Sequence, residues 1–196
     1  MRPLAFTFPY FIVFAGVFLW AFVREAGIVN RASKAAAKVG APADHGSLRV
    51  VMLTQALGFG TSFALAWAPF GLFANRLLAF WMGIALILGG AGLRRLCFRA
   101  LGASFTGEVR VRPDQRVVSS GPYRWVRHPS YTAGILMIVG IAFALDSWLA
   151  AAISFATSLG GYAYRVSVEE RALADAIGAP YREYMSRTRR FVPFLL

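Results

Sequence analysis

Two polar stretches next to apolar runs carry the side chains best suited to chemistry. The first is RHPSY, residues 127–131, which precedes a long apolar run. If a helix begins at Pro129, a residue that helices tolerate in their first turn, then His128 and Tyr131 are neighbours three residues apart. The unpaired backbone N–H groups of such a first turn attract a carboxylate or a phosphate. This stretch therefore predicts an anion-binding helix start.

The second polar stretch follows an apolar run that ends at Tyr164. Arg165 and Glu169 are four residues apart, so a helix would place both on one face, with Glu170 beside them. One alternative is an ordinary surface ion pair, which contributes less than about 1 kcal/mol. Against this alternative, an ionisable group directly at the end of an apolar run is costly and tends to be functional. The spacing alone leaves both alternatives open.

The composition places both stretches in a membrane protein. Of the 196 residues, 58% are hydrophobic and 15% are charged, where soluble domains have roughly 25% charged residues. The mean hydropathy is +0.56. A membrane-spanning helix needs about 20 mostly apolar residues. We therefore expect an all-α integral membrane protein with about five transmembrane helices, near residues 4–23, 50–70, 77–96, 131–148 and 149–164.

The net charge of +12 is explained by membrane topology rather than by nucleic-acid binding. With the N-terminus outside, five spans place all but two of the 21 Lys and Arg residues on the inner side. Such an excess of basic residues is typical of the cytoplasmic side of membrane proteins. Part of it would also attract anionic headgroups, so membrane lipids are expected partners and nucleic acid is not. The C-terminus and both polar stretches are then cytoplasmic.

The N-terminal part, residues 1–93, holds three spans and a basic linker. The linker, residues 24–49, is rich in Ala and Lys, which permits a short surface helix that Gly40 and Pro42 would end. Within the third span, small residues recur at spacings of four and three residues: Ala85, Gly89 and Gly92. This pattern predicts a face for close packing against another helix.

The C-terminal part, residues 94–196, contains both polar stretches. Residues 107–123 alternate in polarity and contain Gly and Pro, which favours an extended cytoplasmic segment. The last two spans, residues 131–164, are short and nearly continuous, which indicates a helical hairpin. After it, Gly178 and Pro180 predict a helix end and a second short helix. Two histidines and one cysteine offer no zinc-type spacing, so no metal site is expected.

Taken together, these motifs resemble a known family. GPYRWVRHPSY, an apolar hairpin, and then YRVSVEERAL and GAPYREYMSRTRRFVP resemble the isoprenylcysteine carboxyl methyltransferase family in its bacterial and archaeal form, which is related to membrane phospholipid methyltransferases. The similarity extends over residues 106–193, and the first three spans match only in character. The resemblance implies a multi-pass protein, in a bacterial or archaeal inner membrane or an ER-like membrane, that transfers a methyl group from S-adenosylmethionine. Residues 94–196 would then form its catalytic region.

The resemblance also implies a role for individual residues. Arg165 would bind the substrate beside the group to be methylated, and Arg165 and Glu169 would be the catalytic residues. The cofactor would be contacted by Gln115, Arg116, Val117, Val118, Tyr123, His128, Pro129, Ser130, Tyr131 and Glu169.

The chemistry of S-adenosylmethionine agrees with this set. Its carboxylate suits the helix start after His128, its ammonium suits Glu169, and its adenine suits stacking on Tyr123 or Tyr131. Its sulfonium cation suits aromatic faces. A carboxylate acceptor, with a pKa near about 4, is ionised at pH 7 and needs no base. An amine acceptor would instead need Glu169 or Glu170 to remove a proton.

The acceptor and the class of function stay open at this point. The membrane setting favours a lipophilic acceptor, with an isoprenylcysteine-type carboxylate first and a thiol, an isoprenoid acid or a phospholipid amine as alternatives. A second function is an NADPH-dependent oxidoreductase similar to membrane sterol reductases, whose C-terminal region looks similar but which have more spans. A third is a non-enzymatic small membrane protein whose charges are purely topological.

Overall fold

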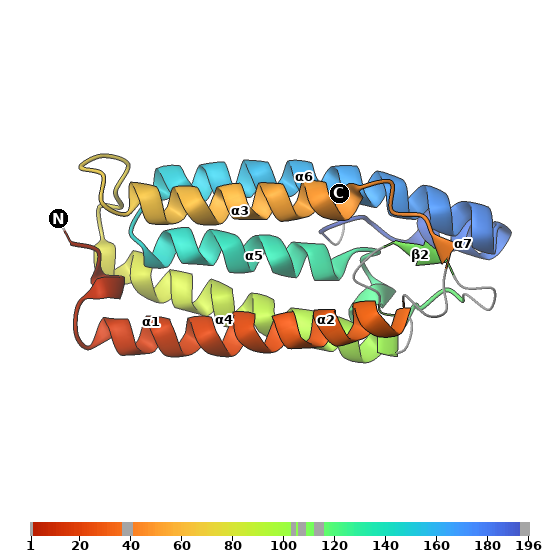
Figure 1. The fold of residues 1–196 in the computed structure, drawn as a ribbon, viewed down its shortest axis with the longest axis horizontal. Coiled ribbons are helices and arrows are strands. Elements are labelled where there is room, and N and C mark those ends of the chain that lie inside the picture. The colour runs from red at the N-terminus through yellow and green to blue at the C-terminus, as the bar shows by residue number, and fades with distance from the viewer. Residues whose placement is uncertain (1, 37–40, 103–104, 106–108, 112–115, 193–196) are drawn as a thin grey trace.

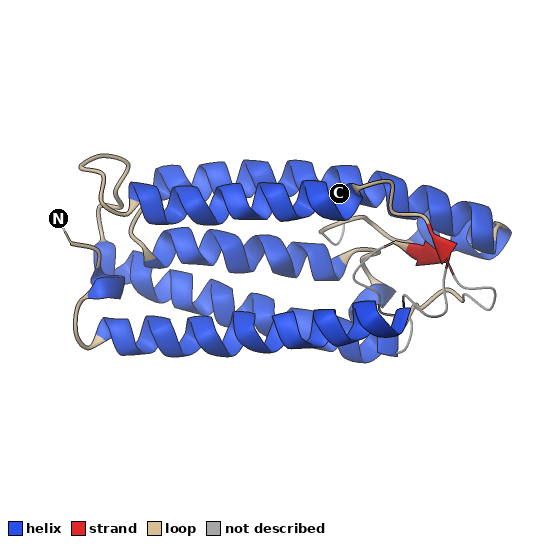
Figure 2. Ribbon diagram, viewed as in Figure 1, coloured by secondary structure: helices blue, strands red, loops and turns tan. Residues whose placement is uncertain are grey.

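The computed structural model describes residues 2–36, 41–102, 105, 109–111 and 116–192. The described residues form a bundle of long helices aligned along one axis, with loops and a short helix gathered at one end (Figure 1). Apart from the helices, Figure 2 shows a small pair of strands at that same end. The strands, β1 Ala41–Pro42 and β2 Arg110–Val111, have two residues each and pair antiparallel. Apart from these two short strands, the regular structure of the described residues is helical, and the expectation of an all-α membrane protein is confirmed.

The first long helix extends well into the predicted linker. A 3-10 turn, Leu4–Phe6, precedes α1, Tyr10–Phe18. One π-helical turn, Leu19–Val23, then joins α1 directly to α2, Arg24–Ala36, and Figure 1 shows one continuous rod. Residues 24–36 are rich in Ala and contain no proline, so nothing ends the helix after Val23. The helix that the sequence permits in the linker is therefore present as α2, but it continues the first span directly, and the predicted end at Gly40 lies outside the described residues.

The next two helices are α3, Ser47–Leu65, and α4, Arg76–Leu101. The Asn75 side chain caps α4 by accepting from the Leu78 N–H, and Gly102 ends the helix in a conformation with φ of 51°. By length and composition, three helices of the described part could cross a membrane: Tyr10–Arg31, Ser47–Leu65 and Arg76–Leu101. The total of five spans stays a prediction.

Helices α5, Pro129–Ala144, and α6, Trp148–Ile177, follow each other across a tight turn. Asp146 takes a left-handed conformation in this turn, and the buried carboxylate pairs with Arg76 at the start of α4. Helix α6 is 30 residues long and continues past Tyr164, so the second polar stretch belongs to the same rigid helix. At Gly178 the chain turns into α7, Ala179–Arg187, with Pro180 in its first turn, as the sequence predicts.

Close packing between helices uses glycines other than those predicted. A Cβ atom on Gly90 of α4 would lie 2.7 Å from the Ala133 carbonyl oxygen of α5, and one on Gly140 would lie 2.8 Å from the Gly83 carbonyl oxygen. Gly89 and Gly92 have nothing within 4 Å of such an atom. The face of α4 that packs closely against α5 is therefore the one with Gly83 and Gly90, and the predicted face with Ala85, Gly89 and Gly92 is wrong.

Candidate active site

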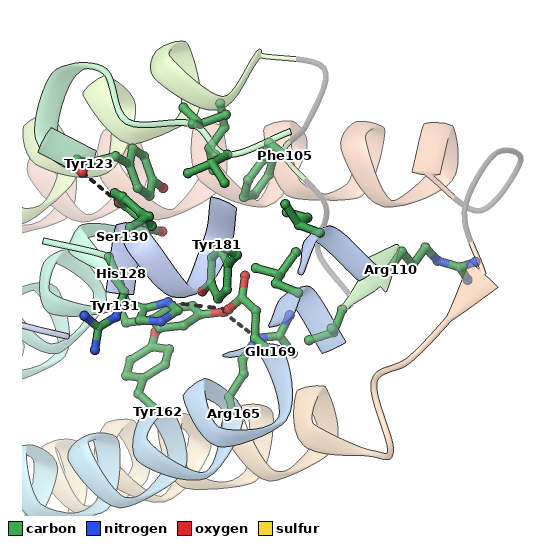
Figure 3. Close-up of a pocket in the computed structure, with 18 of the residues that line it drawn as sticks. Phe105, Arg110, Tyr123, His128, Ser130, Tyr131, Tyr162, Arg165, Glu169 and Tyr181 are labelled. Carbon is green, nitrogen blue, oxygen red and sulfur yellow. Dashed lines mark hydrogen bonds and ion pairs between the residues drawn. The ribbon is translucent and has the colours of Figure 1, made fainter. Parts of the chain in front are cut away.

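A cavity of about 190 Å³ lies at the end of the bundle where the loops gather (Figure 3). Every long helix contributes to its wall, from Val29 of α2 to Ile177 of α6. Among the described residues that line it, Glu169 supplies the carboxylate. Basic and aromatic side chains also line the cavity: Arg94, Arg110, Arg116, Arg127, His128, Arg165, Phe105, Tyr123, Tyr131, Tyr162, Tyr181 and Tyr184.

The cavity brings together most of the residues that the resemblance selected. Those that line it are Arg116, Val117, Val118, Tyr123, His128, Ser130, Tyr131, Arg165 and Glu169. Pro129 is buried at the first position of α5 and starts the helix rather than lining the cavity. Gln115 lies outside the described residues. Among the described residues, no group of three or more His, Cys, Asp or Glu is arranged to hold a metal ion.

The Tyr131 hydroxyl bridges the two residues predicted to be catalytic. Arg165 Nε donates to the Tyr131 hydroxyl oxygen over 2.8 Å, and this hydroxyl donates to Glu169 Oε2 over 2.6 Å (Figure 3). Only 6% of the Arg165 side chain is exposed. The alternative of an ordinary surface ion pair between Arg165 and Glu169 is therefore wrong, because Arg165 is buried and held by groups from other helices.

The ring of Tyr131 is also fully engaged. It stacks on the ring of His128, with centroids 5.4 Å apart, and on the ring of Tyr162, with centroids 4.7 Å apart. These contacts come from the start of α5 and from α6, so they fix the tyrosine between the two helices. Tyr131 therefore acts as part of the wall, and its hydroxyl is the group that it presents to Arg165 and Glu169.

Glu169 and its neighbour Glu170 face different surroundings. Glu170 is 5% exposed and accepts from Arg127 Nε over 2.8 Å and from Arg190 over 2.9 Å. His128 Nε2 lies 3.3 Å from the same carboxylate. Burial alone would raise the pKa of Glu170, but the hydrogen bonds with His128 and Arg127 lower it to about 2. Glu170 thus connects α6 to Arg127, which precedes α5, and to Arg190, which follows α7, while Glu169 lines the cavity.

The start of α5 offers fewer free donors than the sequence suggests. The N–H groups of Tyr131 and Thr132 both donate to the His128 carbonyl oxygen, and Pro129 has no N–H to give. An anion at this helix start would therefore meet the Ser130 N–H rather than a full set of first-turn donors. The backbone of His128 is itself held in place, because its backbone N–H donates to the Arg190 carbonyl oxygen over 3.0 Å.

Arg94 is a cavity residue that the sequence reasoning missed. It lies on α4, where its Nη1 donates to the Ser130 carbonyl oxygen over 2.8 Å. Its Nε lies 2.7 Å from Glu25 Oε1 of α2, as an ion pair rather than an aligned hydrogen bond. An arginine and a glutamate inside long apolar helices are a visible signal for such a pair, because isolated charges are costly there.

The remaining tyrosines of the wall are neutral phenols at physiological pH. Burial raises the pKa of Tyr184 to about 12 and raises those of Tyr123 and Tyr181 as well. The Tyr184 hydroxyl donates to the Tyr123 carbonyl oxygen over 2.7 Å. This bond ties α7 to the 3-10 turn Gly121–Arg124, and so closes one side of the cavity.

The middle of the chain, which includes the start of α5 and most of α6, matches a known family. Residues 82–175 match the isoprenylcysteine carboxyl methyltransferase family. The resemblance predicted from the sequence is therefore confirmed. The match includes Tyr131, Arg165 and Glu169 and ends before α7.

Two relatives, one from a plant and one from a yeast, each match 116 residues of the chain. Protein-S-isoprenylcysteine O-methyltransferase B of Arabidopsis thaliana is 33% identical over 116 residues, which are 58% of this chain and 58% of the relative. Protein-S-isoprenylcysteine O-methyltransferase of Saccharomyces cerevisiae is 28% identical over 116 residues, which are 58% of this chain and 48% of the relative. The chain thus spans about half of the length of these members of the isoprenylcysteine carboxyl methyltransferase family.

A solved structure shares the fold. The structure of the eukaryotic intramembrane Ras methyltransferase, an isoprenylcysteine carboxyl methyltransferase, is similar with a TM-score of 0.62 and 23% identity. The similarity covers 74% of this chain and 52% of that one. It therefore extends beyond the segment matched by sequence and supports an integral membrane fold for the described helices.

Proposed function

We propose that the protein is an integral membrane methyltransferase that transfers a methyl group from S-adenosylmethionine to the carboxylate of a lipophilic acceptor. The observation that carries this proposal is the bridge from Arg165 through Tyr131 to Glu169 at the cavity wall. It places a buried cation and a carboxylate side by side within the segment that matches the family. Because two relatives are named for O-methylation of isoprenylcysteine, an isoprenylcysteine-type carboxylate is the acceptor that we propose first.

The lining suits S-adenosylmethionine, which when bound supplies the activated methyl group. Glu169 is 29% exposed toward the cavity and would bind the ammonium. The ring of Tyr131 is engaged by its neighbours, so Tyr123 is the better of the two predicted partners for the adenine. Tyr181 adds a second aromatic face for a ring or a sulfonium cation. The segment Arg116, Val117 and Val118 also lines the cavity and would contribute to the cofactor site.

Arg165 would hold the acceptor carboxylate. Its guanidinium keeps its charge at any physiological pH and presents several N–H donors in a fixed plane. A carboxylate bound there is already ionised, so the reaction needs orientation rather than proton removal. Glu169 already accepts the Tyr131 hydroxyl proton in a hydrogen bond, which favours a binding role over a role as a base. Because an amine acceptor would need a base and a carboxylate acceptor would not, the engaged state of Glu169 supports a carboxylate acceptor over an amine.

We further propose that the cavity opens on the cytoplasmic side. The end of the bundle that holds the cavity also carries most of the basic residues, from Arg94 and Arg99 on α4 to Arg189 and Arg190 after α7. The opposite end carries Arg2 and Arg76. The positive-inside rule therefore orients the N-terminus outward and the cavity inward.

Ligand-induced stabilisation tests the proposal against the reductase alternative. We expect S-adenosylhomocysteine, the product of the reaction, to raise the melting temperature of the purified protein in detergent, because a ligand that binds the folded state stabilises it. NADPH at the same concentration should have no effect. Stabilisation by NADPH alone would overturn the proposal, and stabilisation by neither would favour a non-enzymatic protein.

Methyl transfer itself is tested in membranes. Membranes that contain the protein are incubated with methyl-labelled S-adenosylmethionine and an N-acetylated S-prenylcysteine with a free carboxylate. The expected product is a base-labile methyl ester, which releases labelled methanol on treatment with alkali. The same acceptor with an amide in place of the carboxylate is the matched control and should stay unlabelled. Label in a base-stable product would indicate transfer to nitrogen or sulfur.

A further inference from the structure

Asp44 lies immediately before α3, outside the segment that matches the family, and is 121 residues away from Arg165 along the chain. Its Oδ1 nevertheless accepts from Arg165 Nη1 over 3.0 Å. The Asp44 side chain is 16% exposed. The N-terminal half of the protein thus supplies a charged partner to the arginine that the proposed function places at the acceptor.

Three further donors hold this carboxylate in place. The Ser47 hydroxyl donates to Oδ1 over 2.9 Å, and the Leu48 N–H donates to Oδ2 over 3.0 Å. The Val109 N–H donates to Oδ1 over 3.2 Å. A side chain held by three groups besides Arg165 is fixed before any ligand arrives, so it can orient a partner without having to be ordered itself.

The consequence for Arg165 is that its guanidinium is held from two directions. Nη1 donates to Asp44 and to the Ser47 hydroxyl, and Nε donates to the Tyr131 hydroxyl. The first two groups come from the start of α3 and the third from α5. Because a guanidinium is planar, contacts at two of its nitrogens from different elements fix the plane in which it meets a carboxylate.

The same carboxylate also connects Arg165 to the rim of the cavity. Val109, whose N–H binds Asp44, lines the cavity, and its carbonyl oxygen accepts from the Ala43 N–H over 3.0 Å. The strand pair of β1 and β2 lies directly next to this contact. Asp44 therefore contacts both the arginine and one residue at the edge of the cavity.

Asp44 keeps its charge under physiological conditions. Burial alone would raise its pKa, but hydrogen bonds from Leu48 and Val109, with the charge of Arg165, lower the pKa below 3.8. The contact with Arg165 is therefore a permanent ion pair and not a proton-dependent one at neutral pH.

We propose that Asp44 is a positioning residue that orients Arg165 toward the acceptor carboxylate. This inference rests on the proposed function, and it assigns part of the acceptor site to the N-terminal half of the chain. Asp44 does not contact the reacting atoms; it acts through the guanidinium. Loss of its charge should therefore weaken use of the acceptor while the cofactor site stays intact.

Asp44→Asn tests the proposal, because it removes the charge and keeps the shape. We expect kcat/KM for an N-acetylated S-prenylcysteine to fall about tenfold or more, while affinity for S-adenosylhomocysteine changes less than about twofold. Asp44→Glu keeps the charge and should recover part of the lost kcat/KM. Asp175→Asn, at an exposed position of α6, makes the same charge change and should behave like the wild type.

The outcomes separate the two proposals. If the wild type neither binds S-adenosylhomocysteine nor labels the acceptor, the proposed function fails. If the wild type does both and Asp44→Asn leaves kcat/KM unchanged, the positioning role is wrong. Equal losses of cofactor affinity and acceptor turnover in Asp44→Asn and Asp44→Glu, with a lower melting temperature, would show that Asp44 serves only the fold.

Discussion

The Tyr131 hydroxyl donates to Glu169 Oε2 over 2.6 Å while it accepts from Arg165 Nε over 2.8 Å. One phenol therefore connects the residue proposed to bind the cofactor ammonium with the residue proposed to bind the acceptor. Its position is set by ring stacking on His128 and Tyr162, which is independent of the hydroxyl. The hydroxyl and the ring can thus be tested separately.

Tyr131→Phe removes the hydroxyl and keeps the ring. A hydrogen bond to a charged group contributes about 1.5–3 kcal/mol, so we expect kcat/KM for the acceptor to fall about tenfold or more. The protein should still fold, because the stacked rings remain. Tyr164→Phe, an exposed tyrosine of the same helix as Arg165, is the matched control. Steady-state kinetics with labelled cofactor measure the change, and an unchanged kcat/KM would contradict the bridge.

Arg165→Ala should impair acceptor use more than cofactor binding. The guanidinium is proposed to bind the acceptor carboxylate, whereas the cofactor ammonium is assigned to Glu169. We expect kcat/KM for the acceptor to fall at least about 100-fold, and the affinity for S-adenosylhomocysteine by less than about fivefold, which corresponds to about 1 kcal/mol. Calorimetry gives the affinity for S-adenosylhomocysteine, and kinetics give kcat/KM for the acceptor. Arg171→Ala, also on α6 but exposed, serves as the control. Equal losses of affinity and of kcat/KM in Arg165→Ala would mean that Arg165 does not bind the acceptor alone, which contradicts the proposed role.

Glu169 and Glu170 are expected to separate binding from stability. Glu169→Gln should weaken S-adenosylhomocysteine about tenfold with little change in melting temperature, because Glu169 faces the cavity. Glu170→Gln should lower the melting temperature, since it removes the carboxylate that pairs with both Arg127 and Arg190. Thermal unfolding and calorimetry on both variants decide the assignment. The reverse pattern would exchange the roles of the two residues.

The contribution of Glu170 should depend on pH in a defined direction. Its pKa lies at about 2 in the folded protein, below the ordinary value of 4.5. A carboxyl group with a lowered folded pKa stabilises the protein above its unfolded pKa and loses this effect as the pH falls through the folded pKa. The shift corresponds to on the order of 3 kcal/mol at neutral pH. We therefore expect the melting temperatures of the wild type and Glu170→Gln to differ at pH 7 and to converge between about pH 4.5 and pH 2. A gap that widens toward low pH would contradict this account. Glu183→Gln, in an exposed pair with Arg187, should show no such trend.

The sequence predicts the site well where neighbouring residues make it and poorly where distant ones do. His128, Tyr131 and Glu169 are recognisable because each polar stretch is local and lies directly next to an apolar run. Asp44 carries no such signal, because its partner is 121 residues away and lies on another helix. Periodicity also fails to predict which face of α4 is buried: Ala85 and Gly89 are exposed, Gly92 is half-buried, and Gly90 makes the close approach instead. A pattern of small residues indicates that a helix can pack closely, but only its partner determines where.

The ion pair between Glu25 and Arg94 should be needed for the bundle to hold its cavity. The Arg94 side chain is 14% exposed and lies between α2 and the start of α5, so removal of Glu25 leaves a mostly buried charge without its partner. Loss of one partner of a buried pair costs more than replacement of both, so we expect Glu25→Gln to destabilise the protein by about 2 kcal/mol or more. Arg94 would still donate to the Ser130 carbonyl oxygen, so S-adenosylhomocysteine should bind at low temperature. Thermal unfolding in detergent, with and without S-adenosylhomocysteine, measures both effects. Glu183→Gln again provides the exposed control, and a melting temperature of Glu25→Gln equal to that of the wild type would mean that α2 is held to the bundle by apolar packing alone.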